Sequence, residues 1–274
     1  MSDVPTGRVP SPSGLLLRER VAIVAALFGV TAVSWLYLWL QAREMTGTSG
    51  TASSGMGDMA GMVMSAGLRP WSAAYFALMF IMWWVMMVGM MVPSAIHMIL
   101  TFATVNRRKR ARGRPFVPTA VFAAGYLMAW GAFSLAATLA QWGLEQAALM
   151  SPMMETSSAI LGGILFLAAG LYQFTPVKYA CLEKCRSPLD FVLNNWREGG
   201  AGALWMGITH GFYCLGCCWL LMLLLFVGGV MNLVWGAAIA AFVFVEKLFP
   251  WGQRIAGVSG AFMLAFGLYL LTQA

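Results

Sequence analysis

ALWMGITHGFYCLGCCWLLMLLLF, residues 203–226, is an apolar run without a charged side chain. About 20 apolar residues suffice for an α-helix to cross the hydrocarbon core of a bilayer, which is about 30 Å thick. Inside lipid, each backbone polar group must find its partner within the protein, so only helices and closed barrels span membranes. Apolar and polar residues do not alternate here with a period of two, as they would in a barrel strand. The run therefore predicts a transmembrane helix.

Similar runs recur along most of the 274 residues. The chain is 60% hydrophobic and only 10% charged, whereas soluble domains carry about 25% charged residues. We therefore expect an all-α, polytopic membrane bundle of about seven transmembrane helices, which excludes a soluble enzyme and a nucleic-acid binder. The first run, Val21–Leu40, exceeds the roughly 7–15 apolar residues of a signal peptide and predicts an uncleaved helix. The expected spans are 21–41, 71–101, 119–141, 158–175, 203–226, 230–247 and 255–272.

The basic residues indicate the orientation. The net charge is +7, and much of the positive charge is concentrated in the connection 107–114. Such a cluster can bind nucleic acid or lipid headgroups, but positive charge also marks cytoplasmic loops, which is the interpretation we favour. An N-terminus in the cytoplasm places every Lys and Arg inside except Arg43 and Arg69. We therefore expect a bacterial inner (cytoplasmic) membrane protein, surrounded by lipid, with a cytoplasmic N-terminus and an external C-terminus.

This topology divides the chain into four parts. Residues 1–20 are expected to form a cytoplasmic tail and residues 21–41 the first transmembrane helix. Residues 42–70 form an external loop rich in methionine, glycine and serine. Residues 71–274 form a six-helix membrane domain, which we expect to bind metal.

The run 203–226 also carries the strongest chemical signal. His210, Cys214, Cys217 and Cys218 are spaced i, i+4, i+7 and i+8, so they share one face of a helix. Imidazole and thiolate are ligands for copper(I), zinc and iron–sulfur centres, and a histidine inside a membrane span usually marks function. Cysteine also packs as a small hydrophobe, and that interpretation would suffice for a single cysteine. For three cysteines beside a histidine we favour metal or redox chemistry.

A second pattern is the methionine row of the second span. Met82, Met86 and Met90 are spaced i, i+4 and i+8, and Met87 and Met91 form a neighbouring row. Thioethers are soft ligands that suit copper(I). Methionine is also a flexible core residue, and a stripe at helical spacing is more often packing. Together with the cysteines, Met86 and Met90 become candidate copper ligands.

The external loop holds a third group of candidates: Met56, Met59, Met62 and Met64. Methionine in a polar loop buries little, so the packing explanation is weak there. The arrangement resembles the soft-metal capture sequences of copper transporters. The alternative is an amphipathic stretch that lies on the membrane surface.

Cys181 and Cys185 form a CxxxC pair in a connection that we expect to be cytoplasmic. Because the cytosol keeps thiols reduced, the pair favours a metal or redox role over a structural disulfide. Other polar residues lie near the ends of the expected spans, and at a membrane edge long side chains reach the headgroups at little cost. We assign no function to the residues of this kind, Tyr172, Gln173, Glu246 and Lys247.

Several stretches in order resemble one family, the predicted metal-binding integral membrane proteins of domain of unknown function 2182. The stretches are Met82–Ser94, Ala169–Lys178 with Cys181–Pro188, and Gly211–Trp219 with Phe226–Asn232. The resemblance runs from about Trp71 to Thr272. It implies a membrane location, a metal role for the five cysteines and the methionine cluster, and a soluble partner protein. It implies no reaction.

These patterns favour an integral membrane protein that handles copper, by transport, delivery or assembly of a copper centre. Copper(I) is the favoured ion and zinc the alternative. A transmembrane thiol–disulfide oxidoreductase is a competing hypothesis, although no external cysteine pair would pass electrons onward. A membrane metalloenzyme that acts with a soluble partner is another. We favour a role other than catalysis, and the patterns leave the direction of transport and the oligomeric state open.

Overall fold

The computed structural model describes residues 12–51, 71–111, 113, 117–151, 154–249 and 251–273. Within these ranges the regular elements are helices. Their bounds are α1 Pro12–Thr51, α3 Ala73–Arg110, α4 Thr119–Gln146, α5 Ala159–Tyr172, α6 Pro176–Arg186, α7 Pro188–Asn194, α8 Gly199–Leu223, α9 Leu225–Gly228, α10 Leu233–Leu248 and α11 Gly252–Thr272.

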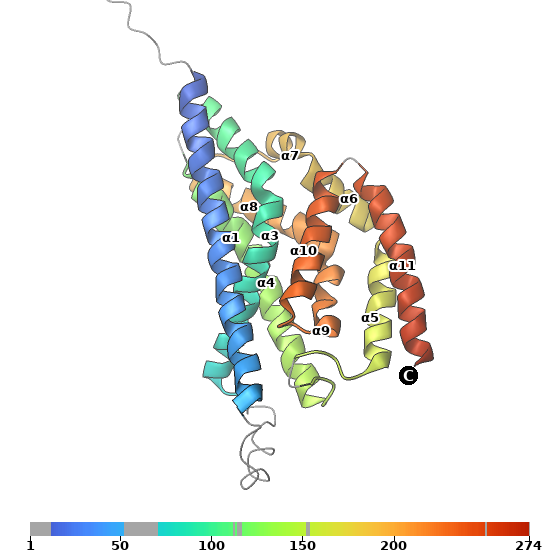
Figure 1. Ribbon diagram of the computed structural model, residues 1–274. Coiled ribbons are helices and arrows are strands. Elements are labelled where there is room, and N and C mark those ends of the chain that lie inside the picture. The colour runs from blue at the N-terminus through green and yellow to red at the C-terminus, as the bar shows by residue number, and fades with distance from the viewer. Residues whose placement is uncertain are drawn as a thin grey trace, which may run out of the picture.

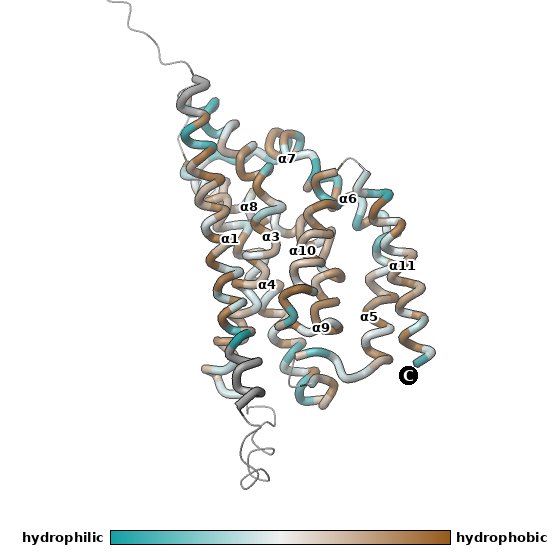
Figure 2. The backbone as a smooth tube through the Cα atoms, viewed as in Figure 1, coloured by the Kyte–Doolittle hydropathy of each residue, from teal (hydrophilic) through white to brown (hydrophobic). Residues whose placement is uncertain are grey.

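The long helices run up and down beside one another (Figure 1). α4 packs on both α3 and α8, and α10 packs on α3. α1 lies against α3 on one side, and α5 pairs with α11 on the other. The short helices α6 and α7 lie at one end of the bundle, which we call the α6/α7 end, and α9 lies at the opposite end, the α9 end. Figure 2 shows the lengths of the helices to be predominantly hydrophobic, with hydrophilic residues gathered towards their ends.

Five helices are long and apolar enough to cross a membrane: Leu17–Arg43 of α1, α3, α4, α8 with α9, and α11. α5 and α6 would count as a sixth span if taken together, but the chain bends by 66° between them. α10 has only 16 residues, fewer than the roughly 20 that a complete span needs. The all-helical membrane-type fold is therefore as expected, whereas seven complete spans are not confirmed.

The expected span 158–175 is interrupted near its end. α5 begins after Ser158, whose hydroxyl accepts from the Leu161 N–H, and it ends at Tyr172. Thr175 then caps α6 by accepting from the Lys178 N–H, and Pro176 takes the first helical position. A capping threonine followed by proline is a typical helix start. This signal ends one helix and begins another, so the chain turns before completing the span.

Two glycines set the distance between α4 and α8. A Cβ on Gly125 would lie 2.1 Å from the Leu204 carbonyl oxygen, and a Cβ on Gly207 would lie 2.0 Å from that of Phe122. Only glycine permits such backbone contact, which is the usual device for close packing of membrane helices. α8 is thereby pressed onto α4 in the N-terminal halves of both helices.

α3 continues through Pro93, which has no N–H to bond the carbonyl of Gly89. The Trp35 indole of α1 donates to this carbonyl at 3.3 Å. α1 thus satisfies the acceptor that proline leaves open. The candidate capture residues Met56, Met59, Met62 and Met64 lie outside the described residues.

Candidate metal centre

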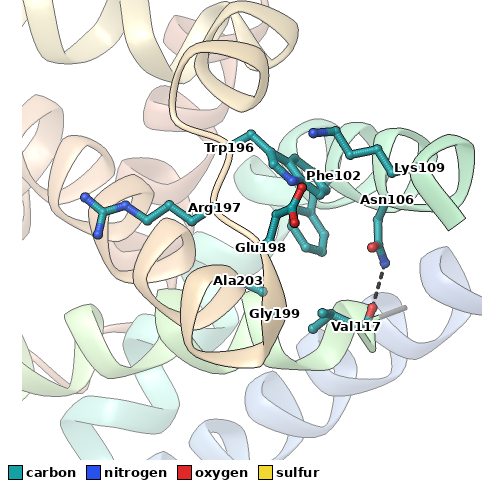
Figure 3. Close-up of a pocket in the computed structure, with 9 residues that line it drawn as sticks. All are labelled: Phe102, Asn106, Lys109, Val117, Trp196, Arg197, Glu198, Gly199 and Ala203. Atoms are coloured by element: carbon teal, nitrogen blue, oxygen red, sulfur yellow. Dashed lines mark hydrogen bonds between the residues drawn. The ribbon is translucent and has the colours of Figure 1, made fainter. Parts of the chain in front are cut away.

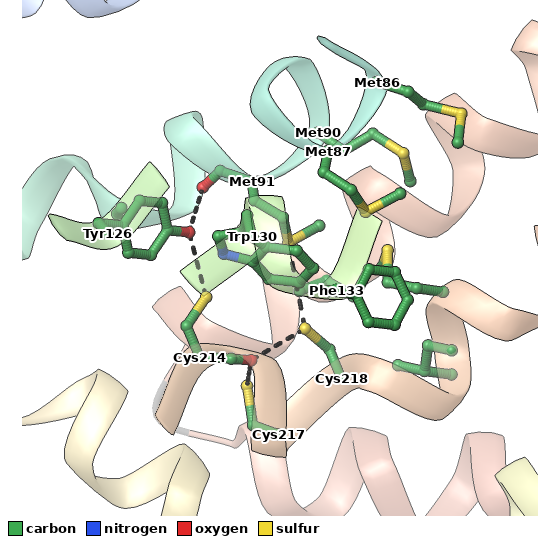
Figure 4. Close-up of a cluster of buried hydrophobic side chains, with 14 of the residues drawn as sticks. Met86, Met87, Met90, Met91, Tyr126, Trp130, Phe133, Cys214, Cys217 and Cys218 are labelled. Atoms are coloured by element: carbon green, nitrogen blue, oxygen red, sulfur yellow. Dashed lines mark hydrogen bonds between the residues drawn. The ribbon is translucent and has the colours of Figure 1, made fainter. Parts of the chain in front are cut away.

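The cysteine face of α8 is buried against its neighbours. His210 is 2% exposed, and Cys214, Cys217 and Cys218 are each 1% exposed. The Cys217 and Cys218 thiols both donate to the Cys214 carbonyl at 3.0 Å (Figure 4). The helical spacing therefore places all four side chains on the interior side of α8, as the sequence predicts.

α6 brings the CxxxC pair to the same place. Cys181 and Cys185 are partly exposed. The Cys185 thiol lies within interaction distance of the Cys214 and Cys217 thiols. Cys181 packs against Gly216, where a Cβ would come within 2.7 Å of its sulfur. The interface of α6 and α8 thus gathers all five cysteines of the chain, each as a free cysteine.

α3 supplies a thioether to this cluster. The Met91 sulfur lies 4.0 Å from the Cys218 sulfur, and Figure 4 shows the two side chains directed towards each other. Met86 and Met90, the methionines singled out from the sequence, are also buried, on a neighbouring strip of α3. The second and fifth expected spans therefore do meet, through Met91, which belongs to the neighbouring row and not to the two methionines singled out from the sequence.

A ring of hydrogen bonds surrounds the Cys214 sulfur. Lys247 Nζ donates to Cys214 Sγ at 2.9 Å and to Ser94 Oγ at 3.2 Å. The Ser94 hydroxyl donates to the Met91 carbonyl at 2.9 Å, and the Tyr126 hydroxyl donates to the same carbonyl at 3.1 Å. A hydrogen bond of 3.1 Å between Tyr126 and Cys214 closes the ring. α3, α4, α8 and α10 meet in this ring, and the Lys247 ammonium places a positive charge beside the Cys214 sulfur.

His210 lies one turn from Cys214, towards the α6/α7 end. Its ring centroid is 6.2, 5.6 and 5.5 Å from those of Phe122, Tyr126 and Phe191. Its Nδ1 is buried and has no hydrogen-bond partner in the described part of the chain. The aromatic side chains hold the imidazole in place and leave one nitrogen unused.

Beside the thiols lies a second buried polar group. Lys178 and Glu246 form an ion pair of 2.6 Å, with their side chains 0% and 1% exposed. Lys178 also donates to the Gln173 side-chain oxygen. The expectation that Glu246 and Lys247 reach the membrane edge is wrong, because both point inward and are buried. The burial of Glu246 and Lys247 was missed because both lie near the end of a predicted span. The short length of α10 is the feature that could have indicated it.

A different polar network ties α3 to α4 nearer the α9 end. The Trp83 indole donates to Gln141 at 2.8 Å, and Gln141 donates to Glu145 at 2.8 Å. The Trp71 indole completes the network with a bond of 2.7 Å to Glu145. Gln141 Nε2 also lies 3.7 Å from the Met79 sulfur. Met79 begins the buried methionines of α3, which continue along the helix to Met91.

A small pocket at the α6/α7 end is shown in Figure 3. Asn106 donates to the Val117 carbonyl at 2.6 Å across it, and the Lys109 ammonium lies 4.3 Å from the Trp196 ring centroid. Its walls come from α3, α8 and the segment before α8. None of the five cysteines lines it, so this pocket is separate from the thiol cluster.

The thiol cluster is not a preformed site for a metal with many ligands. Among the residues that the structure describes, no three His, Cys, Asp or Glu side chains are arranged to hold a metal ion together. The arrangement instead offers pairs of soft sulfur atoms, with the Met91 thioether beside them. Soft sulfur ligands select copper(I), whereas structural zinc requires four tetrahedral ligands.

Comparison with known families identifies a family to which the chain is similar. The family model PpoB2, described as a copper chaperone, matches residues 80–270. This range contains all five cysteines, His210, Met91 and Lys247. Neither the curated proteins nor the solved structures include a match to this chain.

Proposed function

From the premise that the chain belongs to the PpoB2 family of copper chaperones, we propose that it carries copper(I) within a membrane, at the thiol cluster between α6 and α8. The observation that carries this proposal is the convergence of all five cysteines and the Met91 thioether at one place, where the three cysteines of α8 are buried and the two of α6 are partly exposed. Copper is the cargo of such a protein. A pair of thiols among Cys214, Cys217, Cys218 and Cys185 would hold it at any one time, with the Met91 thioether and the unused His210 nitrogen as further donors.

The chemistry of these donors favours copper(I) over zinc. Thiolate and thioether are soft ligands, and copper(I) accepts low coordination numbers. Zinc in a structural site needs four ligands, and the described residues do not present such a set. The buried surroundings exclude water, which protects a bound copper(I) ion from exchange with solvent.

The proposed path runs from the α9 end to the α6/α7 end. Several buried methionines of α3, Met86 and Met90 among them, lie between the α9 end and Met91. Cys181 and Cys185 are more exposed than the cysteines of α8, so they suit transfer to or from a soluble partner protein. With the N-terminus in the cytoplasm of a bacterium, the α9 end faces outward, and the external methionine loop would capture the ion.

A second candidate is thiol–disulfide exchange, which the position of Cys185 beside Cys214 and Cys217 favours. All five cysteines lie in α6 and α8, so a disulfide formed there has no cysteine at the α9 end to accept or supply electrons. Copper handling accounts for the methionines as well as the cysteines, and we therefore prefer it.

The test is a copper(I) titration of the full-length protein in lipid nanodiscs, under anaerobic reducing conditions, with a chromophoric copper(I) chelator as competitor. We expect stoichiometric copper in the wild type and near-complete loss in a Cys214/Cys217/Cys218→Ser triple variant. Cys181→Ser is the matched control, because Cys181 lies at the rim of the cluster, and it should retain the copper. A folded wild type that binds no copper(I) would refute the proposal. Thiol–disulfide exchange would then be the preferred function.

A further inference from the structure

Lys247 is a buried cation in direct contact with a proposed copper ligand. Its side chain is 6% exposed, and its ammonium lies 2.9 Å from the Cys214 sulfur. A cation in such a place costs free energy unless a negative charge compensates it. The identity of that negative charge bears on which metal the site accepts.

The neighbouring charges do not compensate Lys247. Glu246 forms its ion pair with Lys178, and this pair has no net charge. In the described ranges, the ion pairs found do not include one between Lys247 and a carboxylate. The other hydrogen-bond partner of its ammonium is the neutral Ser94 hydroxyl. Of the two groups that accept from the Lys247 ammonium, the Cys214 sulfur is the one that can carry a compensating negative charge.

Charge balance then distinguishes between metals. A monovalent copper ion bound by a pair of thiolates leaves one negative charge, which the ammonium cancels. A divalent ion bound by the same pair is already neutral, so the ammonium leaves an excess positive charge in a buried site. An uncompensated buried charge is strongly unfavourable. The same side chain thus stabilises one complex and destabilises the other.

We propose that Lys247 is the specificity-determining residue of the thiol site, because its fixed ammonium favours monovalent copper over divalent zinc. The inference rests on the proposed copper site and adds the source of its selectivity. Lys247 acts through charge and contacts the ligand Cys214, and it is not itself a ligand. Discrimination of this kind works against the wrong ion as well as for the right one.

A purely structural role would give a different result. Lys247 is part of the hydrogen-bonded ring that joins four helices. If it only held these helices together, its loss would weaken the binding of both metals equally. The ratio of the two affinities therefore separates the two roles, and the stability of the protein does not.

The experiment measures copper(I) and zinc(II) affinities of the protein in nanodiscs, each by competition with a chromophoric chelator. Lys247→Met removes the charge and keeps the length of the side chain. We expect it to shift the copper-to-zinc affinity ratio towards zinc by about tenfold or more, as the loss of one nearby charge implies. If Lys247→Met does not fold, Lys247→Gln removes the charge and keeps a donor to Cys214, with the same expected shift.

Two control variants leave the net charge near the thiols unchanged. Lys247→Arg retains the charge and should keep the ratio within about twofold of the wild type. The double variant Lys178→Met/Glu246→Met removes a pair without net charge and should also leave the ratio unchanged. An unchanged ratio in the neutral Lys247 variants would overturn this inference, as would equal weakening of both metals, while the copper site itself would stand. A wild type without thiol-dependent copper binding would instead refute the proposed function and this inference with it.

Discussion

The bundle contains two buried polar clusters that differ in how completely their hydrogen bonds are made. In the Trp71–Glu145–Gln141–Trp83 network, each indole and each polar side chain has a partner. In the cluster around the thiols, His210 Nδ1 and Gln173 Nε2 have no hydrogen-bond partner in the described part of the chain. Buried polar groups are normally satisfied, and exceptions call for an explanation. The comparison teaches that the first cluster is a structural tie, whereas the second leaves donor atoms unpaired, as the proposed copper site requires.

The largest effect on stability should come from the structural tie. Gln141→Leu removes the acceptor of the Trp83 indole and a donor to Glu145, and leaves both groups buried. We expect a loss of about 2–4 kcal/mol in the free energy of unfolding, since each orphaned group costs about 1–3 kcal/mol. Denaturant unfolding in detergent measures it, with the exposed Gln146→Leu as control. Copper affinity should not change, and a tenfold loss of copper in Gln141→Leu would break the distinction between the clusters.

A smaller effect, confined to copper, should follow Met91→Leu. The substitution conserves volume, so the free energy of unfolding should fall by less than about 1.5 kcal/mol. Loss of the thioether nearest Cys218 should lower the copper(I) affinity by about tenfold, which corresponds to about 1.4 kcal/mol. Chelator competition measures this, with Met90→Leu as the matched control. If Met90→Leu weakened binding more than Met91→Leu, the row predicted from the sequence would be the one that binds the ion.

His210→Phe should have the smallest effect on the free energy of unfolding. Whether this free energy rises or falls is the informative result. Phenylalanine fits among the aromatic rings of Phe122, Tyr126 and Phe191 and removes the buried nitrogen that has no partner. We expect the free energy of unfolding to stay constant or to rise by about 1 kcal/mol, while copper affinity falls. Thermal unfolding and chelator competition on the same sample measure both. A clear loss of stability would mean that the imidazole is structural and belongs with the tie.

The sequence alone predicted much of the helical fold and the placement of four side chains on one face of α8. The spacing of His210, Cys214, Cys217 and Cys218 encodes their common burial, because helical periodicity is a local property. It does not encode which helix lies opposite. That Met91 meets Cys218 depends on how α3, α4 and α8 pack, which is a matter of tertiary structure.

The residues that escaped prediction share one physical cause. Lys178, Glu246 and Lys247 lie near expected span ends, where polar residues normally reach the headgroups. Here the helices that carry them are short, and their ends remain inside the bundle. Thr175–Pro176 could have shown the break before α6, since both are helix-start signals. What the sequence does not contain is the position of each helix end relative to the boundary between the bundle and the lipid.

The brevity of α5 has a consequence for the bilayer itself. Its 14 residues rise about 21 Å at about 1.5 Å per residue, against a hydrocarbon thickness of about 30 Å. Such a hydrophobic mismatch is met by thinning the membrane locally. Thinning on the α6 side would bring headgroups and water close to α6, which carries the two partly exposed cysteines. In the proposed function, copper that leaves the thiols on this side would reach water without crossing the rest of the hydrocarbon core.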